Sequence, residues 1–259
     1  MTQPIETLLF DFGGTLDADG LSWQARFHAH YRAEGLEMAA ESFAPAFYAA
    51  DDALIGVPAP DCDLGETIER LAGNLEAELA RRGGGGGEIC ADCARGRRVA
   101  SRFLAEARAI LARNRPLLET LKARFRLGIV SNFYGNLEAV CQGAGLAGFF
   151  DVIVDSHRVG ARKPDPAIFR AALGPLGAKP ETTLMIGDSL RRDGEGARRM
   201  GMGFVWIAPS TAPTSTLRAG EAELCQSRVA QLSDLAEVLH DRHVRPADPA
   251  RRHHRRRRG

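Results

Sequence analysis

Residues 7–16, Thr7-Leu-Leu-Phe-Asp11-Phe-Gly-Gly-Thr15-Leu, are the stretch that decides the fold of this 259-residue chain. Residues 7–12 form a short apolar run, and a glycine pair directly follows it. Such a run, ended by glycines, is typical of a buried β-strand that leads into a turn. The stretch therefore predicts a strand near the N-terminus with one acidic side chain, Asp11, close to its end.

Strand and helix patterns alternate along the second half of the chain. Apolar runs typical of strands lie at 127–132, 151–155, 183–188 and 204–208, and helical patterns lie around them at 117–125, 137–144, 166–176, the segment up to Met200, and 232–240. Alternation of this kind predicts an α/β fold, with a doubly wound, Rossmann-like parallel sheet that helices cover on both faces. We expect the first strand to join this sheet.

A mostly helical block separates the first strand from the others. Apolar residues recur at helical spacing over 23–36, 41–54, 64–82 and 99–112. We therefore expect a core made of residues 1–16 and 115–245, with residues 17–114 inserted as a helical domain. Five consecutive glycines at 83–87 predict a flexible loop within the insertion, because glycine loses the most conformational entropy when it is ordered.

The bulk composition is that of a soluble globular protein. Hydrophobic residues make up 44% of the chain and charged residues 26%, which are ordinary fractions. No apolar run approaches the roughly 18 residues of a membrane-spanning helix, so we expect no membrane partner. The first residues show neither the basic start nor the apolar stretch of a secretory signal. The cytoplasm is the expected location.

The excess of basic residues lies in one terminal segment. Six arginines occur in residues 251–259, and without them the formal net charge changes from +1 to −5. A basic tail can bind the phosphates of nucleic acid. No aromatic residues interleave with these arginines, however, so we expect residues 246–259 to be a disordered, solvated tail and nucleic acid not to be a partner.

The cysteines predict neither a disulfide framework nor a zinc site. Their number, five, is odd, and disulfides are rare in cytosolic proteins. Cys90 and Cys93 form a CxxC pair, which is half of a common zinc-binding pattern. No second such pair and no close histidine pair accompanies it, so we expect ordinary thiols.

Polar side chains gather where the predicted strands end. In open parallel sheets, ligands bind at the carboxyl ends of the strands. The side chains expected there are Asp11, Ser131, Asn132, Lys163, Asp188 and Asp193. Three carboxylates brought so close would repel one another unless a cation neutralised them. Mg²⁺ is suited to this because it prefers oxygen ligands and usually keeps waters and a substrate phosphate.

The remaining residues at this edge favour phosphoryl transfer. Lys163 is one of only three lysines in the chain, and with the Ser131 hydroxyl it could hold a phosphoryl group. Gly13 and Gly14 allow the backbone to turn and to present N–H groups to an anion. A carboxylate such as Asp11 can act as a nucleophile and divide the reaction into two easier steps. The expected substrate is a small phosphorylated molecule.

These motifs, in this order, closely resemble those of the haloacid dehalogenase-like (HAD) hydrolase superfamily. The resemblance covers the two core segments, and the inserted block resembles the helical cap of that superfamily. It implies a magnesium-dependent phosphatase, a phosphoric monoester hydrolase that is phosphorylated on its nucleophile. The implied catalytic residues are Asp11, Ser131 and Lys163; the implied magnesium ligands are Asp11, the Gly13 backbone carbonyl, Asp188 and Asp193; and the implied phosphate-binding residues are Ser131, Asn132, Lys163 and Gly14. Thr15 would steady the nucleophile loop.

One position departs from the phosphatase pattern of the superfamily. Most of its phosphatases carry a second aspartate two positions after the nucleophile, as the acid/base group, and this chain has Gly13. Acid/base catalysis commonly contributes ~10²–10⁴-fold to the rate. One explanation is a substrate with a good leaving group, such as an acyl phosphate or an anomeric sugar phosphate. Another is a substitute carboxylate, for which Asp17 is a better candidate than Asp19.

Two alternative functions stay open. A 2-haloacid dehalogenase needs no proton for its halide leaving group, but such relatives need no magnesium, whereas Asp188 and Asp193 resemble an intact metal site. A non-catalytic binding or regulatory protein would have no need for three convergent acids, which destabilise a fold without a cation. A phosphonate hydrolase would need a lysine in the cap, and residues 17–114 contain none.

Overall fold

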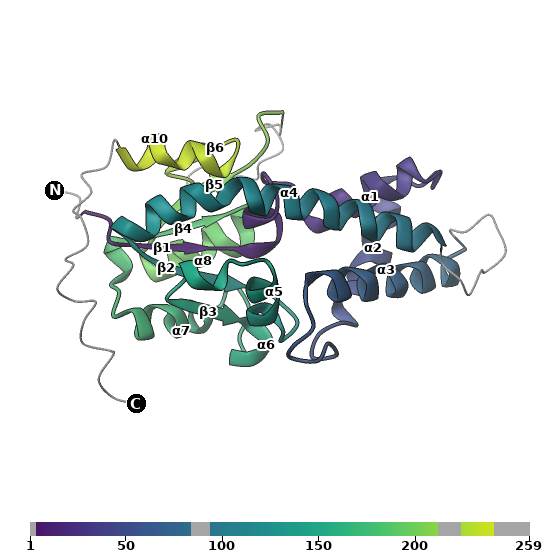
Figure 1. The fold of residues 1–259 in the computed structure, drawn as a ribbon, viewed down its shortest axis with the longest axis horizontal. Helices are drawn as coiled ribbons and strands as arrows, with labels where there is room; N and C mark the ends of the chain where they lie inside the picture. The colour runs from purple at the N-terminus through teal and green to yellow at the C-terminus, as the bar shows by residue number, and fades with distance from the viewer. Residues whose placement is uncertain (1–3, 84–93, 212–223, 241–259) are drawn as a thin grey trace.

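The computed structural model describes residues 4–83, 94–211 and 224–240. At its centre lies a six-stranded sheet in the order β3-β2-β1-β4-β5-β6, in which every neighbouring pair is parallel (Figure 1). The strands are β1 (Thr7–Phe10), β2 (Arg126–Ser131), β3 (Val152–Asp155), β4 (Thr183–Gly187), β5 (Gly203–Ile207) and β6 (Ser227–Val229). Because β1 lies between β2 and β4, Asp11 is flanked by the ends of both strands.

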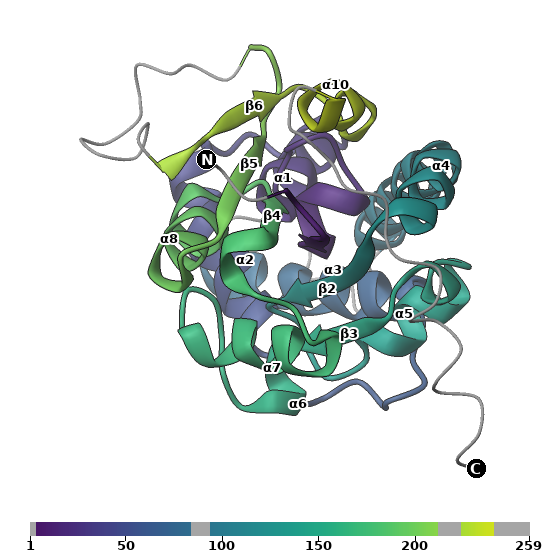
Figure 2. The ribbon, with the colours of Figure 1, turned by 90° about the vertical axis from the view of Figure 1, so that its left-hand side faces the viewer.

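Helices cover both faces of the sheet, as can be seen in Figure 2, which views the sheet along its strands. On one face lie the C-terminal part of α4 (Ala94–Arg124), α5 (Leu137–Gly143) and α10 (Leu235–His240), and on the other lie α7 (Pro166–Leu176) and α8 (Glu195–Met200). Successive strand residues point to opposite faces. Accordingly Leu8 and Phe10 belong to the first apolar cluster and Leu9 to the second. The expected doubly wound α/β fold is confirmed.

The segment between β1 and β2 is helical, which confirms the inserted helical domain. Its helices are α1 (Trp23–Ala33), α2 (Ala40–Asp52), α3 (Leu64–Arg81) and the N-terminal part of α4. They bury one apolar stripe each and share a core in which Tyr31, Phe43, Leu71 and Phe103 are inaccessible to solvent. In Figure 1 this bundle, the cap, lies beyond the carboxyl ends of the strands. The boundaries of the insertion at residues 16/17 and 114/115 stay predictions.

Helix α4 corrects one expectation. The sequence suggested separate helices at 99–112 and 117–125 around Pro116, whereas α4 is continuous through that proline. Proline in a helix interior costs about 3 kcal/mol. Leu111, Leu118 and Leu121 are all buried, and burying a leucine contributes about 2 kcal/mol. Tertiary packing on both sides of Pro116 therefore outweighs the local penalty, and one rigid helix links the cap to the core.

Several short or uncertain features complete the comparison with the sequence. The three-residue β6 and the four-residue α6 (Ser156–Val159) were not predicted, because elements this short give no periodic pattern. The CxxC pair, residues 84–87 of the glycine loop and residues 246–259 lie outside the described residues. Among the described cysteines, Cys62, Cys141 and Cys225 are free thiols. No described helix has the length and apolar character needed to cross a membrane.

Candidate active site

Two side chains hold the same oxygen of Asp11. The Ser131 hydroxyl, at the end of β2, donates to Asp11 Oδ1 over 2.8 Å, and Lys163 Nζ lies 2.7 Å from that oxygen. Asp11 itself is only 4% exposed. None of the described residues hydrogen-bonds Asp11 Oδ2. The carboxylate is therefore fixed through one oxygen, and the other is left for reaction.

Lys163 connects two acidic side chains. Its Nζ lies 2.7 Å from Asp193 Oδ1 as well as from Asp11. Burial lowers the pKa of Lys163, but the carboxylates of Asp11 and Asp193 outweigh it and raise that pKa above its ordinary value. Asn132 fastens the lysine in place, because its Oδ1 accepts from Lys163 N at 2.8 Å and its Nδ2 donates to Lys163 O at 3.2 Å. The ammonium group thus stays charged between two carboxylates.

Asp11, Asp188 and Asp193 form an acidic group with more negative than positive charge around it. One oxygen of each lies within 4.8 Å of one from each of the others. Burial raises the pKa of Asp188 well above its ordinary value, and the charges of Asp11 and Asp193 raise it further. Asp188 Oδ1 is buried without a hydrogen-bond partner in the described part of the chain. The cations beside the group are Lys163 and Arg192; partial burial lowers the pKa of Arg192, but the three carboxylates outweigh it and raise that pKa. Two positive charges do not balance three carboxylates, so the group fits a bound cation.

The residues present fit Mg²⁺. The donors are carboxylate oxygens, and a buried oxygen without a partner is the kind of atom that an ion satisfies. Asp193 is held in place on its other oxygen by the Ser189 N–H at 3.1 Å. Glycine leaves room for the acids, since a Cβ on Gly14, whose φ is +89°, would lie 2.6 Å from Asp188 Oδ2. Gly13, whose carbonyl is the fourth expected ligand, lines a cleft that lies over Asp11.

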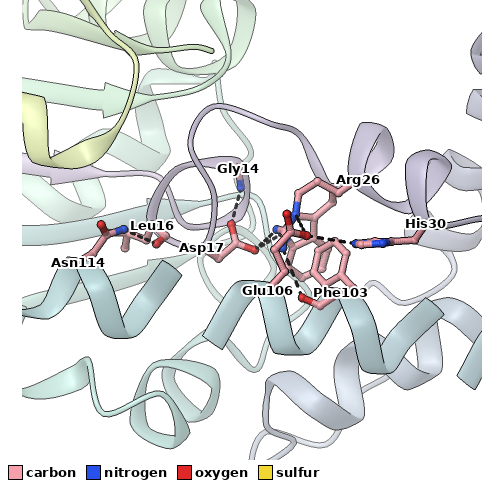
Figure 3. A network of polar contacts seen from close by, with 9 residues as sticks. Gly14, Leu16, Asp17, Arg26, His30, Phe103, Glu106 and Asn114 are labelled. Carbon is pink, nitrogen blue, oxygen red and sulfur yellow. Dashed lines mark hydrogen bonds and ion pairs between the residues drawn. The ribbon is translucent and has the colours of Figure 1, made fainter. Parts of the chain in front are cut away.

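Two residues of the nucleophile loop face away from this cleft. The Asp17 side chain is fully buried, and its Oδ1 accepts from the Gly14 N–H at 2.7 Å. Its Oδ2 accepts from Trp23 Nε1 at 2.7 Å and from Arg26 Nη1 at 3.0 Å (Figure 3). The structure therefore brings neither the Asp17 carboxylate nor the Gly14 N–H to the reacting position. Asp19 forms a surface ion pair with Arg113 at 2.6 Å.

A cleft of about 80 Å³ lies over Asp11, between the core and the cap. Its lining residues are Asp11, Gly13, Ser22, Trp23, Gln24, Phe47, Tyr48, Asp51, Ser131, Asn132, Phe133, Tyr134, Arg162, Lys163 and Arg192. Sequence reasoning missed Asp51, Arg162 and Arg192. The two arginines directly precede Lys163 and Asp193, and that adjacency was the available signal.

The match of a family model decides the family. The model, described as haloacid dehalogenase-like hydrolase, matches residues 5–201. The chain belongs to the haloacid dehalogenase-like hydrolase family. The resemblance seen in the sequence motifs is confirmed, and the chain is a HAD hydrolase.

Curated relatives match this HAD hydrolase over part of their length. The chain is 43% identical to haloacid dehalogenase-like hydrolase domain-containing protein 3 of Bos taurus over a stretch of 87 residues. That stretch covers 34% of the chain and 35% of the relative. It is 37% identical to phosphoserine phosphatase of Thermus thermophilus over a stretch of 109 residues, and that stretch covers 42% of the chain and 41% of the relative. The chain thus spans less than half the length of these two relatives.

Solved structures share the fold across nearly the whole chain. The HAD hydrolase YfnB of Bacillus subtilis, solved bound to magnesium, has a TM-score of 0.53 and 20% identity, covering 92% of this chain and 99% of that one. A dehalogenase solved with an intermediate complex has a TM-score of 0.60 and 18% identity, covering 92% and 98%. At such identities the likeness shows the fold, which a hydrolase and a dehalogenase have in common.

Proposed function

We propose that this HAD hydrolase removes phosphate from small phosphorylated metabolites, with Mg²⁺ as cofactor and Asp11 as the nucleophile that becomes phosphorylated. The observation that carries the proposal is the convergence on Asp11: Ser131 and Lys163 hold its Oδ1, and Asp188 and Asp193 lie beside it. Relatives named phosphoserine phosphatase and glyceraldehyde 3-phosphate phosphatase support the reaction class.

We give each side chain a role that is consistent with its position. Asp11 Oδ2, which has no hydrogen bond from the described residues, forms the bond to phosphorus while the bond from phosphorus to the leaving group breaks and its electron pair goes to the leaving group. Ser131 and Lys163 keep Oδ1 in place, and Asp11 lines the cleft. Water then attacks phosphorus, and the bond between phosphorus and the Asp11 oxygen breaks, with its electron pair returning to the carboxylate. Inorganic phosphate leaves with both protons of that water. Positioning and charge compensation supply most of the catalysis in such transfers.

Magnesium would be held by Asp11, Asp188, Asp193 and the Gly13 carbonyl. Bound there, it would offset the charge of the carboxylates and of the phosphate oxygens. Ser131 and Lys163 would bind the phosphate, and Asn132 would contribute by holding the Lys163 backbone. This assignment explains why so much negative charge is buried at one point, since like charges raise one another's pKa unless a cation is present.

The leaving group narrows the substrate class. Gly13 offers no proton, and the carboxylate of Asp17 is enclosed by Trp23 and Arg26. A phosphatase without an acid favours leaving groups that depart as stable anions. We therefore propose acyl phosphates and anomeric sugar phosphates as the preferred substrates. Alkyl phosphates should react more slowly, because they lack part of the ~10²–10⁴-fold rate enhancement that an acid supplies.

Phosphate release from a panel of alkyl, acyl and anomeric phosphates, with and without Mg²⁺, tests the proposal. Asp11→Asn is compared with Asp61→Asn, a matched change at an exposed cap residue. We expect magnesium-dependent release that Asp11→Asn abolishes and Asp61→Asn leaves intact. Chloride release from 2-chloropropionate without metal would instead establish a dehalogenase. A folded protein that turns over none of these substrates would overturn the proposal and favour a binding role.

A further inference from the structure

The backbone does not require glycine at position 13. Gly13 has φ −74° and ψ 119°, a conformation that any L-amino acid adopts. A side chain there would instead crowd Trp23. A Cβ on Gly13 would lie 3.1 Å from Trp23 Nε1 and 3.4 Å from Trp23 Cε2, and nothing else lies as near. The indole ring therefore fills the space beside the nucleophile that a side chain at position 13 would enter.

The ring of Trp23 is held on several sides. Its Nε1–H donates to Asp17 Oδ2 at 2.7 Å. The ring packs edge-on against Phe103 and Phe133, with ring centroids 5.4 Å and 5.9 Å away. Trp23 is 8% exposed, and the exposed part lines the cleft over Asp11. A ring held by one hydrogen bond and two aromatic neighbours resists the shift of a few tenths of an ångström that a Cβ at position 13 would require.

A buried ion pair lies behind the ring. Asp17 Oδ2 accepts from Arg26 Nη1 at 3.0 Å, and the two side chains are 0% and 2% exposed. Arg26 also donates to the Phe103 carbonyl at 3.4 Å and to Glu106 at 3.2 Å, and its guanidinium lies 3.8 Å from the centre of the Phe103 ring (Figure 3). Buried ion pairs add little to net stability, and in some systems they are retained because they specify one arrangement.

Hydrogen bonds also fasten α1 and the nucleophile loop to α4. Arg26 of α1 donates to the Phe103 carbonyl of α4. Asn114 of α4 donates to the Leu16 carbonyl at 3.0 Å, and both residues are buried (Figure 3). The nucleophile loop, α1 and α4 are thus fastened to one another next to Asp11.

We propose that Asp17 and Arg26 are positioning residues whose ion pair holds Trp23 against Gly13, and that Trp23 thereby closes the space in which an acid/base side chain would stand. The enzyme is restricted in this way to leaving groups that depart without a proton. This consequence rests on the proposed function. The placement of Trp23 by Asp17 does not rest on the proposed function, so the placement and the restriction on leaving groups can be tested separately.

The placement is tested by NMR of the indole N–H groups, since the chain has two tryptophans. The second, Trp206, donates to the Asp188 carbonyl at 2.9 Å and serves as an internal reference. In Asp17→Asn we expect the Trp23 signal to shift and to exchange faster with solvent, while Trp206 stays unchanged. Asp19→Asn, which breaks the surface pair with Arg113, is the matched control and should leave both signals in place. An unchanged Trp23 signal in folded Asp17→Asn would overturn the proposal.

The closure is tested with Gly13→Asp, Trp23→Ala and their combination. Gly13→Asp alone should lower the unfolding midpoint, whereas in the Trp23→Ala background the same change should lower it less, because the ring is gone. Equal effects in both backgrounds would show that Trp23 does not close this space. These measurements hold even if no substrate is turned over.

Activity then tests the consequence for leaving groups. For aryl phosphates, kcat/KM of the native enzyme should fall steeply as the pKa of the leaving group rises. With the poorest leaving groups, kcat/KM of the double variant Gly13→Asp/Trp23→Ala should exceed that of Trp23→Ala by about tenfold or more, which is part of what an acid can supply. With the best leaving groups, kcat/KM of the two variants should be equal. A slope that is equally steep in both variants would contradict the inference.

Discussion

Replacing Lys163 by methionine removes the cation that lies between two of the buried acids, Asp11 and Asp193. Its side chain is 1% exposed, and Nζ lies 2.7 Å from both Asp11 Oδ1 and Asp193 Oδ1. Removing one partner of a buried ion pair costs about 3–5 kcal/mol, because the other charge stays buried without compensation. For a domain of this size 1 kcal/mol corresponds to about 2–4 °C in the unfolding midpoint. We therefore expect the midpoint of Lys163→Met to fall by about 10 °C without Mg²⁺.

Thermal unfolding followed by circular dichroism measures this change. Lys179→Met removes an exposed lysine and should shift the midpoint by little. Asp193→Asn in the Lys163→Met background removes one of the uncompensated carboxylates, so the double variant should be more stable than the sum of the two single changes predicts. A Lys163→Met midpoint within about 2 °C of the native value would refute the view that this ammonium group compensates the acidic group.

Three further predictions concern the metal, the buried ion pair and a thiol. Mg²⁺ at about 100 times its dissociation constant should stabilise the protein by about 2.7 kcal/mol, as a shift of the unfolding midpoint that Asp188→Asn removes; an equal shift in that variant would place the ion elsewhere. Burial raises the pKa of Asp17 and Arg26 counteracts this, so Arg26→Met should raise it further. In this variant the folded state binds the Asp17 proton more readily than the unfolded state does. The loss of stability is therefore expected to be about 3–5 kcal/mol at pH 8 and to shrink as the pH falls toward the ordinary pKa of a carboxyl. Urea unfolding at several pH values measures this loss, and a loss that does not change with pH would contradict the prediction. Burial raises the pKa of Cys141 to about 12, so iodoacetamide at pH 8 should label this thiol far more slowly in the folded than in the urea-unfolded chain, as peptide mass spectrometry can measure, and equal rates would show that the thiol is accessible.

The core could be predicted from the sequence because its signals are local. Helix α7 has the predicted bounds, since a proline begins its pattern and the left-handed Gly177 ends it. Ser131, Lys163 and Asp193 meet Asp11 because Ser131 ends β2, while Lys163 and Asp193 lie in the segments that follow β3 and β4, and these parallel strands end at the same edge of the sheet. Where a distant contact decides the structure, local signals fail. Packing on both sides of Pro116 keeps α4 continuous.

The surroundings of Gly13 could not be predicted in the same way. The sequence shows only that an expected aspartate is missing, and it suggested Asp17 as a substitute. Whether Asp17 points to the cleft depends on where Trp23 and Arg26 of α1 lie, and that depends on how the cap packs on the core. The structure supplies this, and it changes the interpretation of Asp17 from a proton donor to a residue that positions Trp23.

The most direct test of the central claim is to detect the phosphorylated nucleophile. The enzyme is mixed with Mg²⁺ and an acyl phosphate, quenched in acid within the turnover time, digested and analysed by mass spectrometry. The account predicts a phosphoryl group on the peptide that contains Asp11, present in the native protein and absent from Asp11→Asn. Turnover of the substrate with no phosphoryl group on that peptide, or with one on another residue, would contradict it.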